Sequence, residues 1–203
     1  METKLQKGVY CFSQSGVLYK ANEWDKNQMP QGVVVVPDEG SEYAFIVAPH
    51  NTIAAQLSPR KEVYGLITDR ESWDALTATK RIAEAYAGMH HDDPDNETEY
   101  EFDGSPAADF CLGYSHGKIG AGEWAVPTEK QLKAIAKHIR EINECFRAMS
   151  CPTMPLGWYW SSIACEDCAW CAWYVNIYYG YTRDNYRNYG YYVRAVSAFR
   201  QLA

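Results

Sequence analysis

Residues 157–199 read GWYWSSIACEDCAWCAWYVNIYYGYTRDNYRNYGYYVRAVSAF, and this stretch decides the fold and the kind of function to expect. Its second half is rich in tyrosine, at Tyr174, Tyr178, Tyr179, Tyr181, Tyr186, Tyr189, Tyr191 and Tyr192. A folded core has little use for so many phenols, because each buried hydroxyl requires a hydrogen-bond partner. Binding surfaces use tyrosine together with glycine, asparagine and arginine, since its ring gives a large contact at low entropic cost. The stretch therefore predicts a recognition surface.

The same stretch also has the pattern of a terminal sheet. Residues 172–177 and 191–196 alternate or run apolar as strands do, and a polar loop around 180–190 is expected to join them. When a binding surface consists of loops on a rigid sheet, its side chains can be replaced without disrupting the sheet.

A strong helix signal precedes this stretch. Thr128 is placed to cap the helix, Gln131 stands at the reciprocal position of a capping box, and Cys151-Pro152 ends it. Apolar residues recur at helical spacing and should face the core: Leu132, Ile135, Ile139, Ile142, Phe146 and Met149. His138 lies among charged residues, so we expect it to face solvent.

Two further helices are predicted upstream. The first starts at the capping pattern Thr68-x-x-Glu71 and stops near Gly88, and a short one covers residues 106–114. The stretch between them, residues 90–103, is acidic and rich in histidine. It has residues that could bind a cation, but its composition favours a solvated loop.

The first third of the chain is rich in predicted strands. Residues 9–12 and 17–20 flank a turn as a hairpin, and residues 33–36 and 43–47 form two more strands. The order is therefore strands, helices, then strands, which predicts an α+β fold with two main helices. We divide the chain into a β-rich region at 1–65 and a main domain at 66–203.

Composition excludes several classes of function. The net charge of −7 leaves no basic stripe for a nucleic acid. The start of the chain has no apolar run typical of a secretory signal, and the longest aliphatic run, residues 33–36, is too short to cross a bilayer. We expect neither nucleic-acid binding nor membrane insertion.

Seven cysteines are present, and three of them, Cys165, Cys168 and Cys171, have C-x2-C-x2-C spacing. This spacing could hold a metal or an iron–sulfur cluster, but a structural site needs a fourth ligand and there is no second CxxC. Without a signal peptide, reduced thiols are expected instead of disulfides. We therefore predict no metal site and no cofactor.

Four motifs in order carry a resemblance to a known family: residues 124–128 (WAVPT), 157–162 (GWYWSS), 172–176 (AWYVN) and 192–199 (YVRAVSAF). Together they resemble the C-type-lectin-fold ligand-binding domains of diversity-generating retroelement variable proteins, a group that includes phage major tropism determinants. The likeness covers roughly the last two thirds of the chain. Residues 8–47 also resemble the β-rich leader of gut-bacterial and phage members.

The resemblance implies that residues from about 157 to 199 vary between copies. In such proteins a reverse transcriptase copies a template with errors at adenines, so that asparagine codons become codons that never encode Lys, Glu, Gln, Met or Trp. Residues 163–192 contain no Lys, Gln or Met, and Glu166, Trp170 and Trp173 would then be fixed positions. The composition agrees with this origin, which would also explain the cysteines.

The resemblance also divides the residues between a scaffold and a surface. Trp158, Trp160, Trp173, Val175, Val193 and Val196 would pack the scaffold. The ligand-binding set would be Ile163, Cys165, Asp167, Cys168, Cys171, Tyr174, Asn176, Tyr178, Tyr179, Tyr181, Arg183, Asp184, Tyr186, Arg187, Asn188, Tyr189 and Tyr191. The polar and tyrosine side chains from Tyr178 to Tyr189 would project outward, Arg187 and Asn188 included.

The implied partner is a protein ligand or host-surface receptor. The chain itself would be located on a phage virion (its tail) or in a bacterial cell, and a homo-oligomer is possible. Calcium-dependent sugar binding is not expected, because the tail has no EPN or WND triplet. An invariant adhesin or pilus component is the alternative. An enzyme related to formylglycine-generating enzymes, suggested by residues 122–128, is disfavoured because no histidine or other base accompanies the tail cysteines and serines, so we expect no catalytic residues.

Overall fold

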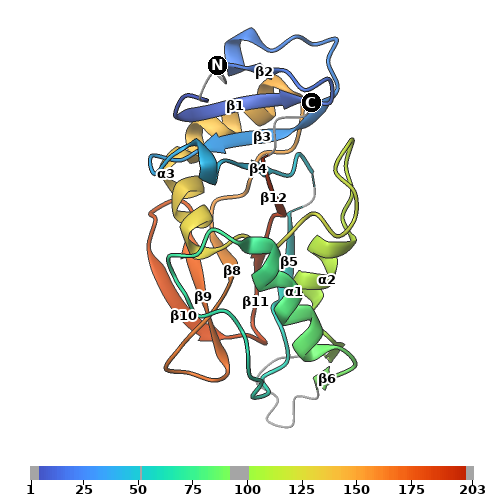
Figure 1. Cartoon of the computed structure of the whole chain (residues 1–203), viewed down its shortest axis with the longest axis vertical. Coiled ribbons are helices and arrows are strands. Elements are labelled where there is room, and N and C mark those ends of the chain that lie inside the picture. The colour runs from blue at the N-terminus through green and yellow to red at the C-terminus, as the bar shows by residue number, and fades with distance from the viewer. Residues whose placement is uncertain (1–4, 51, 92–100, 200–203) are drawn as a thin grey trace.

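The computed structural model describes residues 5–50, 52–91 and 101–199, and these residues form an α+β fold built on two five-stranded sheets. The first sheet has the order β12-β4-β3-β1-β2 and the second the order β10-β9-β8-β11-β5 (Figure 1). The strands of the first sheet are β1 (Gly8–Ser13), β2 (Leu18–Tyr19), β3 (Pro30–Val36), β4 (Phe45–Val47) and β12 (Val196–Ala198). The strands of the second are β5 (Ile53–Gln56), β8 (Trp158–Ala164), β9 (Cys171–Asn176), β10 (Thr182–Tyr186) and β11 (Gly190–Val193).

The remaining elements are helices and one short strand pair. The helices are α1 (Ala75–Tyr86), α2 (Pro106–Gly113) and α3 (Glu129–Ala148), with single 3₁₀ turns η1 (Ala21–Glu23) and η2 (Ser41–Tyr43). The strands β6 (His90–His91) and β7 (Phe102–Asp103) pair antiparallel. They flank residues 92–100, so most of the predicted acidic loop lies outside the described residues.

The longest helix, α3, starts as the sequence predicts. Thr128 accepts a hydrogen bond from the Gln131 N–H, and the Gln131 side chain accepts one from the Thr128 N–H, which completes the capping box. The apolar positions predicted to face the core are all buried. His138 differs from the prediction, because its side chain is only 17% exposed.

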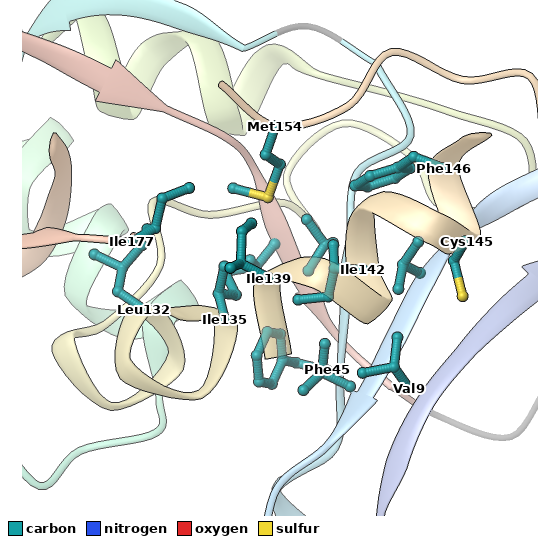
Figure 2. Packing of buried hydrophobic residues seen from close by; sticks show 14 of the residues in the cluster. Val9, Phe45, Leu132, Ile135, Ile139, Ile142, Cys145, Phe146, Met154 and Ile177 are labelled. Atoms are coloured by element: carbon teal, nitrogen blue, oxygen red, sulfur yellow. The ribbon is translucent and has the colours of Figure 1, made fainter. Parts of the chain in front are cut away.

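The helix α3 lies between the two sheets and supplies one of the two core clusters. Its isoleucines at 135, 139 and 142 pack between Val9 and Phe45 of the first sheet and Met154 and Ile177 on the other side (Figure 2). Burying an aliphatic side chain contributes about 1.5–3 kcal/mol, so this stripe is a main source of stability. It also packs on Ile177, which directly follows β9.

The start of α1 was predicted wrongly. The cap is Asp74, whose carboxylate accepts the Thr77 N–H at 3.0 Å, and not Thr68. The carboxylate of Asp69 accepts the Glu71 N–H at 2.9 Å, so the predicted first turn is a non-helical turn. Asp and Thr both form such local bonds, and the sequence pattern alone did not show which one begins the helix.

Each of the two regions proposed from the sequence contributes one strand to the sheet that the other region mainly forms. The strand β5, from the first 65 residues, pairs antiparallel with β11 at the edge of the second sheet. In return, β12 near the end of the chain pairs with β4 at the edge of the first sheet (Figure 1). The residues on either side of position 65 therefore build both sheets together.

Two local predictions near the end of the chain are corrected. The polar stretch expected to be a loop contains β10, which pairs in full with β9. The strand expected at residues 191–196 is interrupted between β11 and β12, where Arg194 is buried. Its guanidinium donates to Ala48 O, Thr52 Oγ1 and Pro152 O at 2.7–3.0 Å, and these bonds hold the crossing between the two sheets. Within the described ranges, no helix is both long and apolar enough to span a membrane.

Candidate functional site

The turn between β9 and β10 presents three tyrosines to solvent. Tyr178, Tyr179 and Tyr181 are 53%, 64% and 65% exposed. Their rings touch: those of Tyr178 and Tyr179 are 4.6 Å apart at 77°, and those of Tyr179 and Tyr181 stack at 5.6 Å. We call these three residues the tyrosine cluster. Such rings in mutual contact form an amphipathic patch that loses little entropy on binding.

Asn176 holds the tyrosine cluster in place. Its side-chain oxygen accepts the N–H of Tyr178 at 3.0 Å and of Tyr179 at 3.1 Å, and its backbone bonds Gly180 and Tyr181. Gly180 has φ +75°, a left-handed conformation that glycine adopts at little cost. A Cβ at Gly180 would lie 4.0 Å from the Ala136 Cβ, so the turn rests against α3. The turn that carries the tyrosine cluster is therefore held by the hydrogen bonds of Asn176 and by contact with α3.

A second group of aromatic side chains lies on one face of the second sheet. The register pairs Arg183 with Tyr174 and Tyr174 with Trp160, so these three side chains share a face. The Tyr174 ring stacks on that of Tyr191 at 4.4 Å and 9°, and Asn185 donates to the Tyr191 hydroxyl at 2.8 Å. Burial raises the pKa of Tyr174 to about 12, so its phenol stays neutral.

The outer edge of this face is charged and exposed. Arg183 lies 5.8 Å from the centre of the Trp158 ring, close enough for a cation–π contact. Asp184 follows on the opposite face of β10, because side chains alternate along a strand. The face therefore offers a guanidinium over aromatic rings, which is a common arrangement at protein interfaces.

A third aromatic group lies at the far end of β10. The Arg60 guanidinium lies 3.9 Å over the Tyr186 ring and 5.7 Å from the Trp170 ring, and Tyr186 stacks on Tyr189 at 6.5 Å. Four steps along β10 separate this group from the tyrosine cluster, or about 14 Å. No sequence pattern pointed to Arg60, which lies more than 100 positions before Trp170.

The expectation that Arg187 and Asn188 project outward is wrong. They are 1% and 3% exposed, and the Arg187 Nη2 donates to the carbonyl of Ala169. Burial lowers the pKa of Arg187, and its Nε and Nη1 have no hydrogen-bond partner within the described residues. This guanidinium supports the turn at 165–171 from inside and does not reach a ligand.

The predicted set therefore divides by exposure. Six members are exposed: Asp167, Tyr178, Tyr179, Tyr181, Arg183 and Asp184. Four are partly exposed: Cys168, Tyr186, Tyr189 and Tyr191. Seven are buried, which removes their side chains from the surface as it stands: Ile163, Cys165, Cys171, Tyr174, Asn176, Arg187 and Asn188.

The cysteines also differ from expectation. Cys168 and Cys171 form a disulfide, so the prediction of reduced thiols is wrong for this pair. Cys165 is a buried free thiol, and burial raises its pKa to about 12. The described residues hold no group of three or more His, Cys, Asp and Glu side chains placed to bind a metal ion.

The opposite face of β9 is tied to the helix layer by charge. Arg70 lies 3.7 Å over the Trp173 ring and donates two hydrogen bonds of 2.7 Å to the buried carboxylate of Glu129. Lys133 lies 2.7 Å from the same carboxylate. These contacts anchor the face of β9 that lies opposite Tyr174.

Comparison with protein-family models and with curated protein sequences finds no match to this chain.

Proposed function

We propose that this chain is a ligand-binding protein that contacts a protein partner through the tyrosine cluster and the adjoining face of β9 and β10. The exposed, braced cluster of Tyr178, Tyr179 and Tyr181 is the observation that carries this proposal. Tyrosine and arginine are the residues that most often dominate binding energy at protein interfaces. Arg183 beside the cluster adds a charge that fixes the orientation of a partner.

The fold proposed for this surface is the C-type-lectin-like fold of retroelement variable proteins. Its support is the α+β order with two main helices, and a mixed sheet that carries the tyrosine-rich segment. In such a protein the exposed positions of this segment would vary between copies. The buried Tyr174 and Asn176 would tolerate few replacements, because each supports the frame below the surface.

The separation of exposed, replaceable positions from a buried supporting frame favours a role in recognising changing targets. The protein would then be displayed on a phage virion or a bacterial cell. A surface of this kind binds by contact area and specific charges, and it requires no cofactor. The exposed phenols can be replaced one by one while α3 and both sheets keep their packing.

A display screen tests binding directly. The purified chain is screened against host surface proteins, and each captured partner is measured again with the triple variant Tyr178→Ala, Tyr179→Ala and Tyr181→Ala. Loss of a hot spot costs about 2 kcal/mol or more, so the triple variant should weaken binding at least about 30-fold. The matched control replaces Val17, Met29 and Tyr64 by alanine; these are exposed large side chains outside the tail. Equal affinity of the triple variant and the native chain would refute the proposed surface.

The coding sequence tests the diversification. A near-copy of the segment for residues 163–192, with adenines at the asparagine, tyrosine and aspartate codons and a reverse-transcriptase gene beside it, is expected. If related strains carry an identical segment and no such copy, the chain is an invariant adhesin instead.

A further inference from the structure

The strand β10 is an outer strand of the second sheet. It pairs with β9 on one side, and no strand of the described residues pairs with its other side (Figure 1). The pairing with β9 runs residue by residue from Thr182 to Tyr186. An outer strand leaves the backbone groups of alternate residues available for pairing with another chain.

Two backbone hydrogen bonds show which residues of this strand face β9. Asn176 N–H donates to Tyr181 O at 2.8 Å, just before the strand begins. Arg187 N–H donates to Trp170 O at 3.0 Å, just after it ends. Backbone groups alternate along an antiparallel strand, so the odd-numbered residues from 181 to 187 point theirs at β9. The even-numbered residues therefore point theirs away from the sheet.

Thr182 and Asp184 form the open part of this edge. Their backbone N–H and C=O groups have no hydrogen-bond partner within the described residues. The next outward-facing residue is Tyr186, and its N–H is occupied by the side-chain oxygen of Asn185 at 2.8 Å. The edge available to another chain is therefore short, and it lies between the tyrosine cluster and Tyr186.

Two charges of opposite sign lie on the open edge without ion-pair partners. Arg183 and Asp184 are exposed neighbours whose side chains point to opposite faces of the sheet. Neither forms an ion pair with a described residue. Arg70 lies over the Trp173 ring on the face of Asp184, but its guanidinium is committed to the carboxylate of Glu129. The two exposed charges are therefore available to opposite charges of a partner.

The same charges disfavour pairing of β10 with a second copy of itself. In a two-fold antiparallel pair, outward-facing residues meet outward-facing residues, so the pair is centred on Arg183, Asp184 or Asn185. The first two arrangements set like charges directly opposite each other, which is destabilising. The third requires the Tyr186 N–H, which the Asn185 side chain occupies. The edge therefore favours a strand of different sequence.

Aromatic groups lie at both ends of the open edge. The tyrosine cluster precedes β10, and the Tyr186 ring at its other end lies 3.9 Å from the Arg60 guanidinium. Since a strand advances about 3.4 Å per residue, an extended segment of about six residues reaches from one group to the other. The edge and its two ends together match a short recognition strand.

We propose that the partner protein adds a short antiparallel strand to the open edge of β10, with a basic side chain opposite Asp184 and a carboxylate opposite Arg183. This inference rests on the proposed function and specifies how the partner meets that surface. Because the added strand runs antiparallel, its basic residue directly precedes its acidic residue.

The backbone and the side chains of the added strand have separate roles. Its backbone exchanges hydrogen bonds with Thr182 and Asp184, which any sequence can do, and its side chains supply the selectivity. Arg183 lies in a non-hydrogen-bonded pair, where facing side chains approach most closely, so the carboxylate opposite it carries most of that selectivity.

The first test titrates the peptide acetyl-Thr-Val-Lys-Glu-Val-Thr-amide into the ¹⁵N-labelled chain. We expect the Thr182 and Asp184 amide resonances to shift and their hydrogen exchange to slow. The control peptide acetyl-Thr-Val-Glu-Lys-Val-Thr-amide has the same composition and net charge, but it sets like charges opposite each other. It should bind at least about tenfold more weakly. Equal affinity of the two peptides, or no change at either amide, would overturn the proposal, and tighter binding of the control peptide would overturn the antiparallel direction.

Two N-methylated forms of the Lys-Glu peptide separate strand addition from attraction between charges. The N–H of the peptide lysine faces the Asp184 backbone, so its methylation should weaken binding about tenfold. The N–H of the peptide glutamate points to solvent, so its methylation should have a much smaller effect. The same affinity for both forms would exclude the proposed pairing of backbones.

A protein variant with exchanged charges tests the selectivity. Arg183→Asp with Asp184→Arg keeps the net charge and should reverse the preference, so that the Glu-Lys peptide binds more tightly. The matched control Arg81→Glu with Glu84→Arg exchanges two exposed charges on α1 and should keep the native preference. An unchanged preference in the first variant would refute the assigned pairs.

The partners captured in the display screen distinguish failure of this inference from failure of the proposed function. If the triple tyrosine variant loses a captured partner and the charge-exchanged variant keeps it, the proposed function stands and strand addition is refuted. If the peptides respond as expected but the triple tyrosine variant keeps every captured partner, strand addition stands and the tyrosine cluster is refuted.

Discussion

The side-chain oxygen of Asn176 accepts the backbone N–H of Tyr178 at 3.0 Å, and this bond ties a buried residue of β9 to an exposed residue of the tyrosine cluster. The same oxygen accepts the Tyr179 N–H, so one amide orders the first half of the turn. Replacing Asn176 by alanine should free both N–H groups and cost about 1–2 kcal/mol of unfolding free energy. Hydrogen exchange of the Tyr178 and Tyr179 amides should then accelerate.

Asn176→Asp is the matched control, because it keeps an oxygen acceptor at the same position. Unchanged exchange at Tyr178 and Tyr179 in the alanine variant would show that packing on α3 orders the turn without this bond.

Two tyrosines of the same segment should respond differently to replacement. Tyr174 is 7% exposed and stacks on Tyr191, so Tyr174→Ala should lower the unfolding free energy by about 3–5 kcal/mol. Tyr179 is 64% exposed, so Tyr179→Ala should change it by less than about 0.5 kcal/mol. Urea denaturation of both variants measures the difference. Similar losses would mean that the exposed ring is part of the fold.

The ion pair of Arg70 with Glu129 predicts a dependence of stability on pH. Burial raises the pKa of Glu129, but hydrogen bonds from Arg70 and Lys133 outweigh it and hold the pKa below its ordinary value of 4.5. A depressed folded pKa means that the carboxylate contributes stability above pH 4.5, which is lost as the pH falls through the folded pKa.

The variant Glu129→Gln isolates this contribution. At pH 7 the free energy of unfolding of this variant should be about 2 kcal/mol lower than that of the native chain. This value is discounted because the Arg70 side chain is 43% exposed. The gap between the variant and the native chain should shrink as the pH is lowered from 5 to 3 in denaturant titrations. A gap that stays constant over this range would assign the loss to packing.

The disulfide between Cys168 and Cys171 predicts a labelling pattern. Under native conditions iodoacetamide should modify neither these two nor the five buried free thiols. After mild reduction Cys168 should react first, because it is partly exposed whereas Cys171 is buried. Closure of so short a loop contributes about 2 kcal/mol by the chain-entropy estimate, so the reduced chain should unfold at lower urea concentration. Alkylation of Cys168 without reductant, followed by mass spectrometry, would contradict the disulfide.

Replacing either of two buried arginines by methionine should change the free energy of unfolding differently. The Arg187 Nε and Nη1 have no partner within the described residues, so Arg187→Met should leave stability unchanged or raise it by up to about 2 kcal/mol. Arg194 donates from Nε, Nη1 and Nη2, and its carbonyl and hydroxyl acceptors would lose those bonds in Arg194→Met. The free energy of unfolding of that variant should fall by about 3 kcal/mol. Equal losses in the two urea titrations would show that Arg187 also has a full set of partners.

Local residue patterns account for the elements that form through short-range contacts. The capping box of Thr128 and Gln131 fixes the start of α3, and the 3.6-residue spacing of its isoleucines fixes the buried face. The hairpin of β1 and β2 follows from the turn between two apolar runs. The aromatic character of the β9–β10 region is also visible in the sequence, because composition alone shows it.

Long-range packing determines which members of the tyrosine-rich stretch reach solvent. Arg187 and Tyr178 are equally plausible surface residues by type, yet one is 1% and the other 53% exposed. The difference comes from the pairing of β9 with β10 and from Leu57 and Ser58, whose N–H groups bond the Arg187 carbonyl from 130 and 129 positions away. The pairing of β5 with β11 and of β12 with β4 has the same origin. Such contacts depend on the closure of long loops and on register, which no local pattern encodes.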